Sequence, residues 1–186
     1  MAKHVCPWWA GYLLASPIRS WITESPEDML APFVREGMTL LEPGPGMGFF
    51  TLPLAQMVGP AGRVIAVDIQ PKMLSGLQRR AMKKGLADRI ETRLAGQEGM
   101  PLSDLKGTVD FALAFAMVHE LPSAEVFFSQ VAGALKTGAL LFLAEPAGHV
   151  KPARFQQELI AAQKAGLEAV SQPTVRRSLT ALFRKA

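Results

Sequence analysis

The sequence feature that most limits the possible folds is a set of three glycines at alternate positions directly after an apolar run. The run ends at Glu42, and the glycines follow at Gly44, Gly46 and Gly48. Glycine is required where a turn needs a positive φ or where a ligand comes close to the backbone. The helix that we expect over 49–58 would present free N–H groups and the positive end of its dipole at its start. The pattern therefore predicts a strand, a glycine turn and a helix that together bind a nucleotide-type ligand.

A second landmark is the β-branched run that begins at Arg63 and ends at Asp68, followed by Ile69. A run of this composition without a breaker predicts a buried strand. A carboxylate at the tip of the second strand is placed to accept hydrogen bonds from both ribose hydroxyls of a nucleoside. Asp68 could instead cap the helix that we expect to start near Pro71, and this role does not exclude the first.

The spacing of the glycines distinguishes between classes of nucleotide. The dinucleotide fingerprint G-x-G-x-x-G requires a glycine at position 49, where this chain has Phe49. The observed E-x-G-x-G-x-G pattern, with the acid of the second strand in register, resembles the class I S-adenosylmethionine-dependent methyltransferases. The resemblance implies that the glycine turn wraps the methionine end of S-adenosyl-L-methionine and that Glu42 helps to hold its ammonium group. It also implies that Asp68 and Ile69, in a stretch similar to V-D-I-x-x-x-M-L, belong to the cofactor site.

The resemblance continues into the third and fourth expected strands, with one departure. Residues 95–102 are similar to the family's G-D-A-E-x-L-P-F loop, in which an acid receives the adenine amino group. Gly96 stands at the position of that acid, so Gln97, a backbone carbonyl or water must hold the adenine. We place Phe115, at the end of the strand expected over 108–115, in the cofactor site as well.

The order of the expected elements indicates the α/β class. Strands alternate with helices along most of the chain, and the last two strands, 167–172 and 178–184, follow one another directly. This order predicts a mostly parallel sheet with an antiparallel C-terminal edge. The resemblance makes it a three-layer Rossmann-like sheet of about seven strands, formed by one methyltransferase domain over 25–186. Its first helix should begin at the N-cap Ser25 and run to Val34.

Residues 1–24 contain Trp8, Trp9 and Tyr12. In the family, an N-terminal segment often closes over the cofactor and supplies the acceptor pocket, so the resemblance implies a lid here. The alternative is that these aromatic side chains simply pack on the side of the domain. We expect no secretion, because little charge precedes the apolar run and Pro7 interrupts it early.

Candidate residues for catalysis lie after the fourth and fifth strands. His119, Glu145 and His149 all follow strand ends, the edge where α/β sheets bind ligands. A neutral imidazole there can take a proton from an acceptor. We assign His119 and Glu145 to catalysis, and His149 with the aromatic residues of segment 1–24 to acceptor binding. The structural alternative for His119 is a backbone hydrogen bond at the start of the helix expected over 123–135, and the role of Glu120 is equally open.

Composition sets the remaining limits. With 186 residues, of which 49% are hydrophobic, the chain can bury a core as one globular domain. Cys6 is the only cysteine, which excludes an internal disulfide and a multi-thiolate zinc site within one chain, and we expect a cytoplasmic location. We assign no residue to a metal site. No apolar run approaches the roughly 18 residues of a spanning helix. The net charge of +4 is spread over the helix with Arg80 and over the C-terminus, which we interpret as solvated faces rather than a nucleic-acid surface.

These observations favour methyl transfer from S-adenosyl-L-methionine to a small molecule. Positioning and exclusion of water can supply most of the rate of an in-line displacement at a sulfonium methyl, so the chemistry requires no triad or metal cluster. A nicotinamide oxidoreductase would need the dinucleotide spacing and normally a second domain. The alternative is an RNA methyltransferase or a non-catalytic S-adenosylmethionine-binding partner subunit, which the positive net charge permits.

Overall fold

The computed structural model describes residues 25–96 and 99–186. The predicted lid segment, with Trp8, Trp9 and Tyr12, and the predicted adenine contact Gln97 therefore lie outside the described residues. Two compact units can be distinguished, which we call the N-terminal unit, up to Pro101, and the C-terminal unit, from Leu102 to Ala186.

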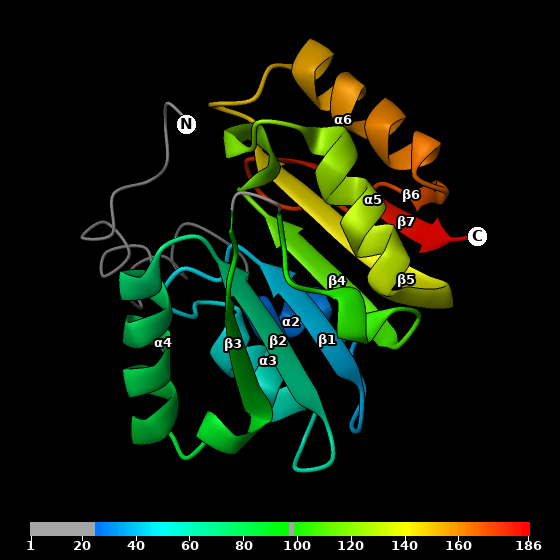
Figure 1. Ribbon diagram of the computed structural model, residues 1–186. Coiled ribbons are helices and arrows are strands. Elements are labelled where there is room, and N and C mark those ends of the chain that lie inside the picture. The colour runs from blue at the N-terminus through cyan, green and yellow to red at the C-terminus, as the bar shows by residue number, and fades with distance from the viewer. Residues whose placement is uncertain (1–24, 97–98) are drawn as a thin grey trace. The chain divides into compact units, whose positions relative to one another are not determined.

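The N-terminal unit consists of two consecutive β-α-β crossovers after a short helix. Its elements are α2 (Pro26–Leu30), β1 (Thr39–Pro43), α3 (Thr51–Met57), β2 (Arg63–Asp68), α4 (Pro71–Lys83), the 3₁₀ turn η2 (Ala87–Arg89) and β3 (Ile90–Leu94). The three strands are parallel and lie in the order β3-β2-β1, as Figure 1 shows. The helix α4 packs on β2 and β3. Because β2 is buried along nearly its whole length, it reads as the continuous apolar run of a parallel strand.

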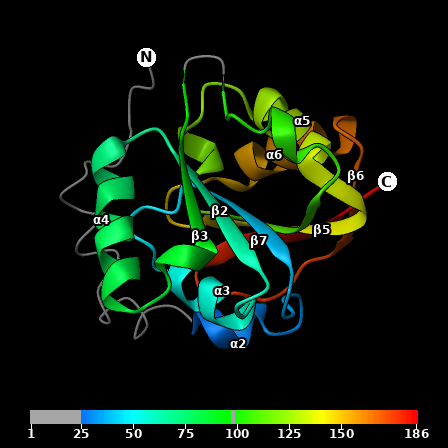
Figure 2. The same ribbon diagram turned by 60° about the horizontal axis from the view of Figure 1, so that its bottom comes forward.

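The C-terminal unit carries the remaining four strands. Its elements are η3 (Ser103–Leu105), β4 (Val109–Phe115), η4 (Val118–Glu120), α5 (Ala124–Ala134), β5 (Leu135–Pro146), α6 (Pro152–Lys164), β6 (Leu167–Ser171) and β7 (Ser178–Lys185). The order is β4-β5-β7-β6, with β4 and β5 parallel and β7 antiparallel to both of its neighbours. The helices α5 and α6 pack against each other, which Figure 2 shows from a second direction. Phe128 of α5 meets Phe183 of β7 in the core, with 6.4 Å between the ring centroids.

The α/β class, the seven strands and the antiparallel C-terminal edge are confirmed. The first helix is shorter than predicted: Ser25 caps it by accepting a hydrogen bond from the Asp28 N–H, but it ends at Leu30 instead of Val34. Pro32 explains the early end, since it has no N–H to continue the helical hydrogen bonds. Within the described residues, no helix is both long and apolar enough to cross a membrane.

Candidate functional site

The glycine turn connects β1 to α3, and its three glycines all have positive φ. The values are +69° for Gly44, +54° for Gly46 and +86° for Gly48. A Cβ atom on Gly46 would meet no described atom within 4 Å, whereas one on Gly48 would collide with the side chain of Leu77 on α4. Gly46 is therefore the position where a ligand can approach the backbone, and Gly48 is the position that lets α4 pack on the turn.

The turn is anchored on two sides. The Gly44 N–H donates to the Val67 carbonyl of β2 at 2.8 Å. From α4, the Arg80 guanidinium donates to the Met47 carbonyl. The interpretation of Arg80 as part of a solvated face is thus wrong, because its half-buried side chain reaches inward to the turn. Charge counting missed this role, since the distance of 33 residues between the two partners is visible only in the fold.

The predicted acids stand at the ends of β1 and β2. Glu42 is buried, with 3% of its surface exposed, and the parallel register of β1 and β2 puts its strand end at the same edge as Asp68. The Asp68 Oδ1 atom accepts a hydrogen bond from the Gln70 N–H at 2.8 Å, which fixes the direction of this carboxylate. The N-cap of α4 is Gln70, so Asp68 stabilises the turn before the helix without being its cap. Ile69 beside it is 49% exposed and offers apolar surface at this edge.

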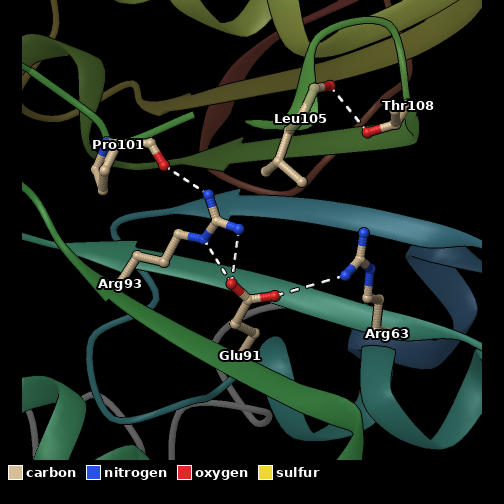
Figure 3. Close-up of polar contacts among 6 residues, drawn as sticks. All are labelled: Arg63, Glu91, Arg93, Pro101, Leu105 and Thr108. Atoms are coloured by element: carbon tan, nitrogen blue, oxygen red, sulfur yellow. Dashed lines mark hydrogen bonds and ion pairs between the residues drawn. The ribbon is translucent and has the colours of Figure 1, made fainter. Parts of the chain in front are cut away.

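The predicted adenine loop is held at both ends. Gly96 and Gly99 exchange backbone hydrogen bonds of 3.1 and 3.2 Å. Arg93 of β3 binds the Glu91 carboxylate through Nε at 2.7 Å and donates to the Pro101 carbonyl at 2.6 Å, as Figure 3 shows. The carbonyl of Gly96 therefore already accepts one hydrogen bond, and only its second lone pair is left for a ligand.

In the C-terminal unit, His119 and Glu145 form one hydrogen-bonded pair. Glu145, at the end of β5, is fully buried and accepts from the Val118 N–H at 2.7 Å and from Nδ1 of His119. His119 lies in η4, and 23% of its side chain is exposed. The hydrogen bond from the Glu145 carboxylate raises the pKa of the His119 imidazole above its ordinary value of 6.5, while partial burial acts in the opposite direction. His119 is thus a histidine with one nitrogen fixed by a buried acid, so that Nε2 is left for chemistry.

The other candidates of this unit are arranged as follows. Phe115 is the last residue of β4, and Ala116 after it has a φ of +56°, which is unusual for a residue other than glycine. The Ala116 N–H donates to the Ala144 carbonyl at 2.7 Å, so the neighbouring strand holds this conformation. His149 is exposed in the turn after β5, with its N–H bonded to the Pro146 carbonyl at 2.9 Å.

A further acid, Glu158 on α6, was missed by the motif search. It is fully buried, and Arg154 lies one turn away with its Nε atom 3.6 Å from Glu158 Oε1. Burial raises the pKa of Glu158 to about 7, and the negative charge of Glu145 adds to this increase. Helical periodicity could have found it, because Glu158 falls on the same face as the buried residues Phe155 and Ala162.

Three comparisons with known proteins are informative. Residues 41–143, more than half of the chain, match the sequence family described as "Methyltransferase domain". The arsenite methyltransferase of Halobacterium salinarum is 30% identical over 109 residues, which are 59% of this chain and 27% of that protein. The ubiquinone/menaquinone biosynthesis C-methyltransferase of Brucella anthropi is 31% identical over 109 residues, 59% of this chain and 41% of that protein. The chain therefore spans less than half the length of these curated relatives.

The fold is similar to that of a solved structure over nearly its whole length. A SAM-dependent methyltransferase from Aquifex aeolicus superposes with a TM-score of 0.84 at 25% sequence identity, covering 97% of this chain and 98% of the other.

Proposed function

The chain belongs to this methyltransferase-domain family, whose members depend on S-adenosyl-L-methionine, and we propose that it transfers a methyl group from this cofactor to a small molecule. The observation that carries the proposal is the edge of β1 and β2. There β1 and β2 are parallel neighbours with the acids Glu42 and Asp68 near their carboxyl ends, and the turn that follows β1 has open space at Gly46. The open space beside the Gly46 backbone lets a ligand approach the turn closely, and the two carboxylates suit a ligand that has a cationic ammonium group and a ribose.

Each part of this edge has a proposed role. Gly44, Gly46 and Gly48 receive the methionine end, where the Glu42 carboxylate holds the ammonium group. Asp68 accepts hydrogen bonds from the ribose hydroxyls, and exposed Ile69 covers one face of the adenine. The proposal also assigns three residues to the adenine region, namely Gly96, Gln97 and Phe115.

When bound, the cofactor would supply an electrophilic methyl group for attack by a lone pair of the acceptor. The contribution of the protein is to position the acceptor, exclude water and receive the acceptor's proton. We propose that Nε2 of His119 takes this proton as the acceptor atom attacks. Glu145 is fully buried, so it acts through His119: it fixes the Nδ1–H tautomer and stabilises the imidazolium that forms.

Which acceptor is used does not follow from the relatives. One is named for arsenite and another for a carbon atom in quinone biosynthesis, so likeness at about 30% identity spans different acceptor chemistry. We therefore propose only that the methyl acceptor is a small molecule and that His119 receives its proton. His149, exposed after β5, and the aromatic residues Trp8, Trp9 and Tyr12 are the proposed contacts to the acceptor.

Titration calorimetry tests the cofactor part of the proposal. The protein should bind S-adenosyl-L-methionine or S-adenosylhomocysteine and not NADH. Asp68→Asn keeps an oxygen that can accept from the Gln70 N–H but removes the charge, so affinity should fall by about 1–3 kcal/mol. Asp88→Asn in η2 is the matched control and should leave the affinity unchanged. Equal affinity in the wild type and Asp68→Asn would restrict Asp68 to its role in the turn, and NADH binding without a response to either sulfur nucleoside would refute the assignment.

The acceptor part requires a turnover assay. Release of S-adenosylhomocysteine should be followed with a panel of small oxygen, nitrogen, carbon and arsenic acceptors, and in parallel with RNA. Turnover on RNA alone would favour the nucleic-acid alternative.

A further inference from the structure

Two turns at one edge of the C-terminal unit are joined by a hydrogen bond. One turn, 147–151, follows β5, and the other, 172–177, precedes β7. Because β5 and β7 are antiparallel neighbours whose register pairs the last residue of β5 with the first of β7, the two turns meet at the same edge, as can be followed in Figure 1. The Ala147 N–H donates to the Arg177 carbonyl at 3.0 Å, so each turn holds the other in place.

The exposed side chains of these turns are basic. Val150 and Val175 are buried and anchor one turn each, and neither turn contains an acidic residue. We call the exposed basic residues the basic turn surface; they are His149, Lys151, Arg176 and Arg177. No hydrogen bond or ion pair joins their side chains to another residue in the described part of the chain. The positive charge of this surface is therefore not neutralised by contacts within the protein.

Arg177 adopts a backbone conformation that is unusual for its residue type. The Ser178 N–H donates to the Val175 carbonyl at 3.1 Å and closes a four-residue turn, in which Arg177 is the third residue with a φ of +59°. A positive φ at this position of a turn favours glycine or asparagine, because a longer side chain strains the backbone. The shape of the turn therefore does not explain an arginine here, and strain of this kind is typical of a side chain with a function.

The basic turn surface adjoins the strand end that carries the His119–Glu145 pair. The Arg177 carbonyl binds Ala147, which is only two residues after Glu145. At about 3.3 Å per residue of extended chain, this separation is about 7 Å at most. Both oxygens of Glu145 are occupied, by His119 and by a backbone N–H of η4, so they are not available to the cations of the surface.

The chemistry of the surface suits an oxyanion. Guanidinium groups without an internal partner can donate charge-assisted hydrogen bonds to a carboxylate or a phosphate. We propose that the basic turn surface binds an anionic group of the methyl acceptor, which is then a small molecule with a carboxylate or phosphate group. The proposal rests on the function proposed above, in which His119 receives the proton of the acceptor.

The first experiment measures anion binding without cofactor or acceptor. The arginine Nε–H signals of the full-length ¹⁵N-labelled protein are followed while inorganic phosphate, or separately acetate, replaces chloride at constant ionic strength. Arg176→Gln and Arg177→Gln assign the two signals, which should shift and saturate with at least one of the two anions.

Arg184 is the matched control for this titration. It is exposed, has no described partner for its side chain, and lies at the opposite end of β7. Its signal should not saturate. An equal response of all three arginines, or no saturable response to either anion, would overturn the proposal. The comparison of phosphate with acetate shows which oxyanion the surface prefers.

Arg177→Gly separates function from structure. Glycine relieves the strain of the positive φ, so the free energy of unfolding should stay equal or increase. The same substitution removes a guanidinium, so the affinity of the Arg176 signal for the anion should fall. Urea unfolding and the phosphate or acetate titration measure the two properties. An anion affinity that is the same in the wild type and in Arg177→Gly would contradict the proposed role of Arg177.

The last experiment tests the acceptor class by S-adenosylhomocysteine release. Acceptors are offered in pairs, each carboxylate with its amide and each phosphate with its alcohol. The wild type should prefer the charged member by about 10-fold or more in kcat/KM. Arg176→Gln and Arg177→Gln should lose most of this preference through KM, whereas Arg184→Gln should keep it.

The outcomes separate this proposal from the proposed function. Turnover of neutral acceptors that is insensitive to Arg176 and Arg177 would overturn the anionic class and leave methyl transfer intact. Saturable anion binding without turnover on any acceptor would refute the proposed function while the anion site itself stands. Retention of RNA that is lost in the double variant, without a response to phosphate or acetate, would assign the surface to a nucleic acid and overturn the proposal.

Discussion

Glu145 and His119 are 26 residues apart in the chain, yet the buried carboxylate of Glu145 forms a hydrogen bond with Nδ1 of the partly exposed His119 imidazole. The second oxygen of Glu145 is occupied by the Val118 N–H at 2.7 Å, so the carboxylate cannot turn away from the ring. A histidine fixed in this manner has one tautomer in its neutral form, with the lone pair on Nε2. The arrangement therefore suits His119 to accept a proton at Nε2.

The first prediction concerns this pair. Glu145→Gln removes the charge that raises the pKa of His119, so the pKa should fall toward its ordinary value of 6.5. The amide can also bind the ring in the wrong tautomer, and turnover should decrease by about 10²-fold or more. The His119 NMR titration and the pH–rate profile measure the two effects. In the wild type the rate should increase with pH through the His119 pKa, because only the neutral imidazole accepts a proton.

A matched control is Glu120→Gln, which removes a neighbouring charge but no hydrogen bond to the ring. It should shift the His119 titration less than Glu145→Gln does, since Glu120 is a smaller contributor. If turnover of Glu145→Gln equals that of the wild type, His119 does not act as the base.

The second prediction concerns stability and pH. The folded protein holds the proton of Glu158 up to a pKa of about 7, whereas the unfolded chain releases it near 4.5. Between these values the folded state binds more protons, so the free energy of unfolding should decrease as pH rises, by at most about 3 kcal/mol. Glu158→Gln should lack this part of the decrease. Urea unfolding at pH 5 and pH 8 measures the change in the free energy of unfolding between the two pH values. An equal change in the wild type and in Glu158→Gln would contradict the raised pKa of Glu158.

His119 adds to the same trend, since its pKa is also raised in the folded state. Its contribution to stability is fully present below the unfolded value of 6.5 and is lost as pH rises through the folded value. A His119→Asn variant separates this part from that of Glu158.

The sequence predicted those features that local chemistry determines. The glycine turn, the two acid-tipped strands and the cap of α2 follow from residue types at fixed spacing. Pro32 could have corrected the end of α2, because a proline four residues after Asp28 ends the helical hydrogen bonding. These elements needed no knowledge of distant contacts.

The missed features depend on packing between distant segments. Arg80 was taken for a solvated charge because its partner, the Met47 carbonyl, becomes its neighbour only when α4 lies on the glycine turn. The pairing of His119 with Glu145 depends on β4 and β5 being parallel neighbours, so that both strand ends meet at one edge. Glu158 was not predicted because the candidate residues were chosen at strand ends, whereas Glu158 lies on the buried face of helix α6.

The third prediction separates the roles of two glycines. Alanine at Gly46 must adopt a φ of +54° but meets no described atom, so Gly46→Ala should lose about 1–2 kcal/mol of stability. Its methyl group enters the proposed cofactor cradle, so affinity for S-adenosyl-L-methionine should fall sharply. Gly48→Ala combines the strain of a φ of +86° with a collision against Leu77, so it should destabilise the protein more.

Urea unfolding and titration calorimetry on the two variants distinguish these effects. Leu77 is fully buried, so Leu77→Ala itself destabilises the protein, but it should cost less in Gly48→Ala than in the wild type, because it removes the collision, and about the same in Gly46→Ala as in the wild type. Cofactor affinity unchanged in Gly46→Ala would place the ligand elsewhere.

The last prediction concerns residues 1–24, which lie outside the described residues. The connections after β4 and β5 are short, since only residues 116–123, which include η4, separate β4 from α5, and only residues 147–151 separate β5 from α6. These loops offer little surface to shield a reacting methyl group from water, so we expect residues 1–24 to supply the shield. Trp8, Trp9 and Tyr12 have large apolar faces with polar tips, as the wall of a pocket requires.

Deleting residues 2–14 should therefore preserve the fold and much of the cofactor affinity while it abolishes turnover on any acceptor that is found. Circular dichroism, calorimetry and S-adenosylhomocysteine release measure the three properties on one preparation. Substituting Trp8 and Trp9 together by leucine is the finer test, because it keeps apolar bulk and removes the indole N–H groups. If the deletion variant turns over at the wild-type rate, the acceptor pocket must consist of the strand-end loops around His119 and His149 alone. If it also loses cofactor affinity, the segment contributes to holding the cofactor itself.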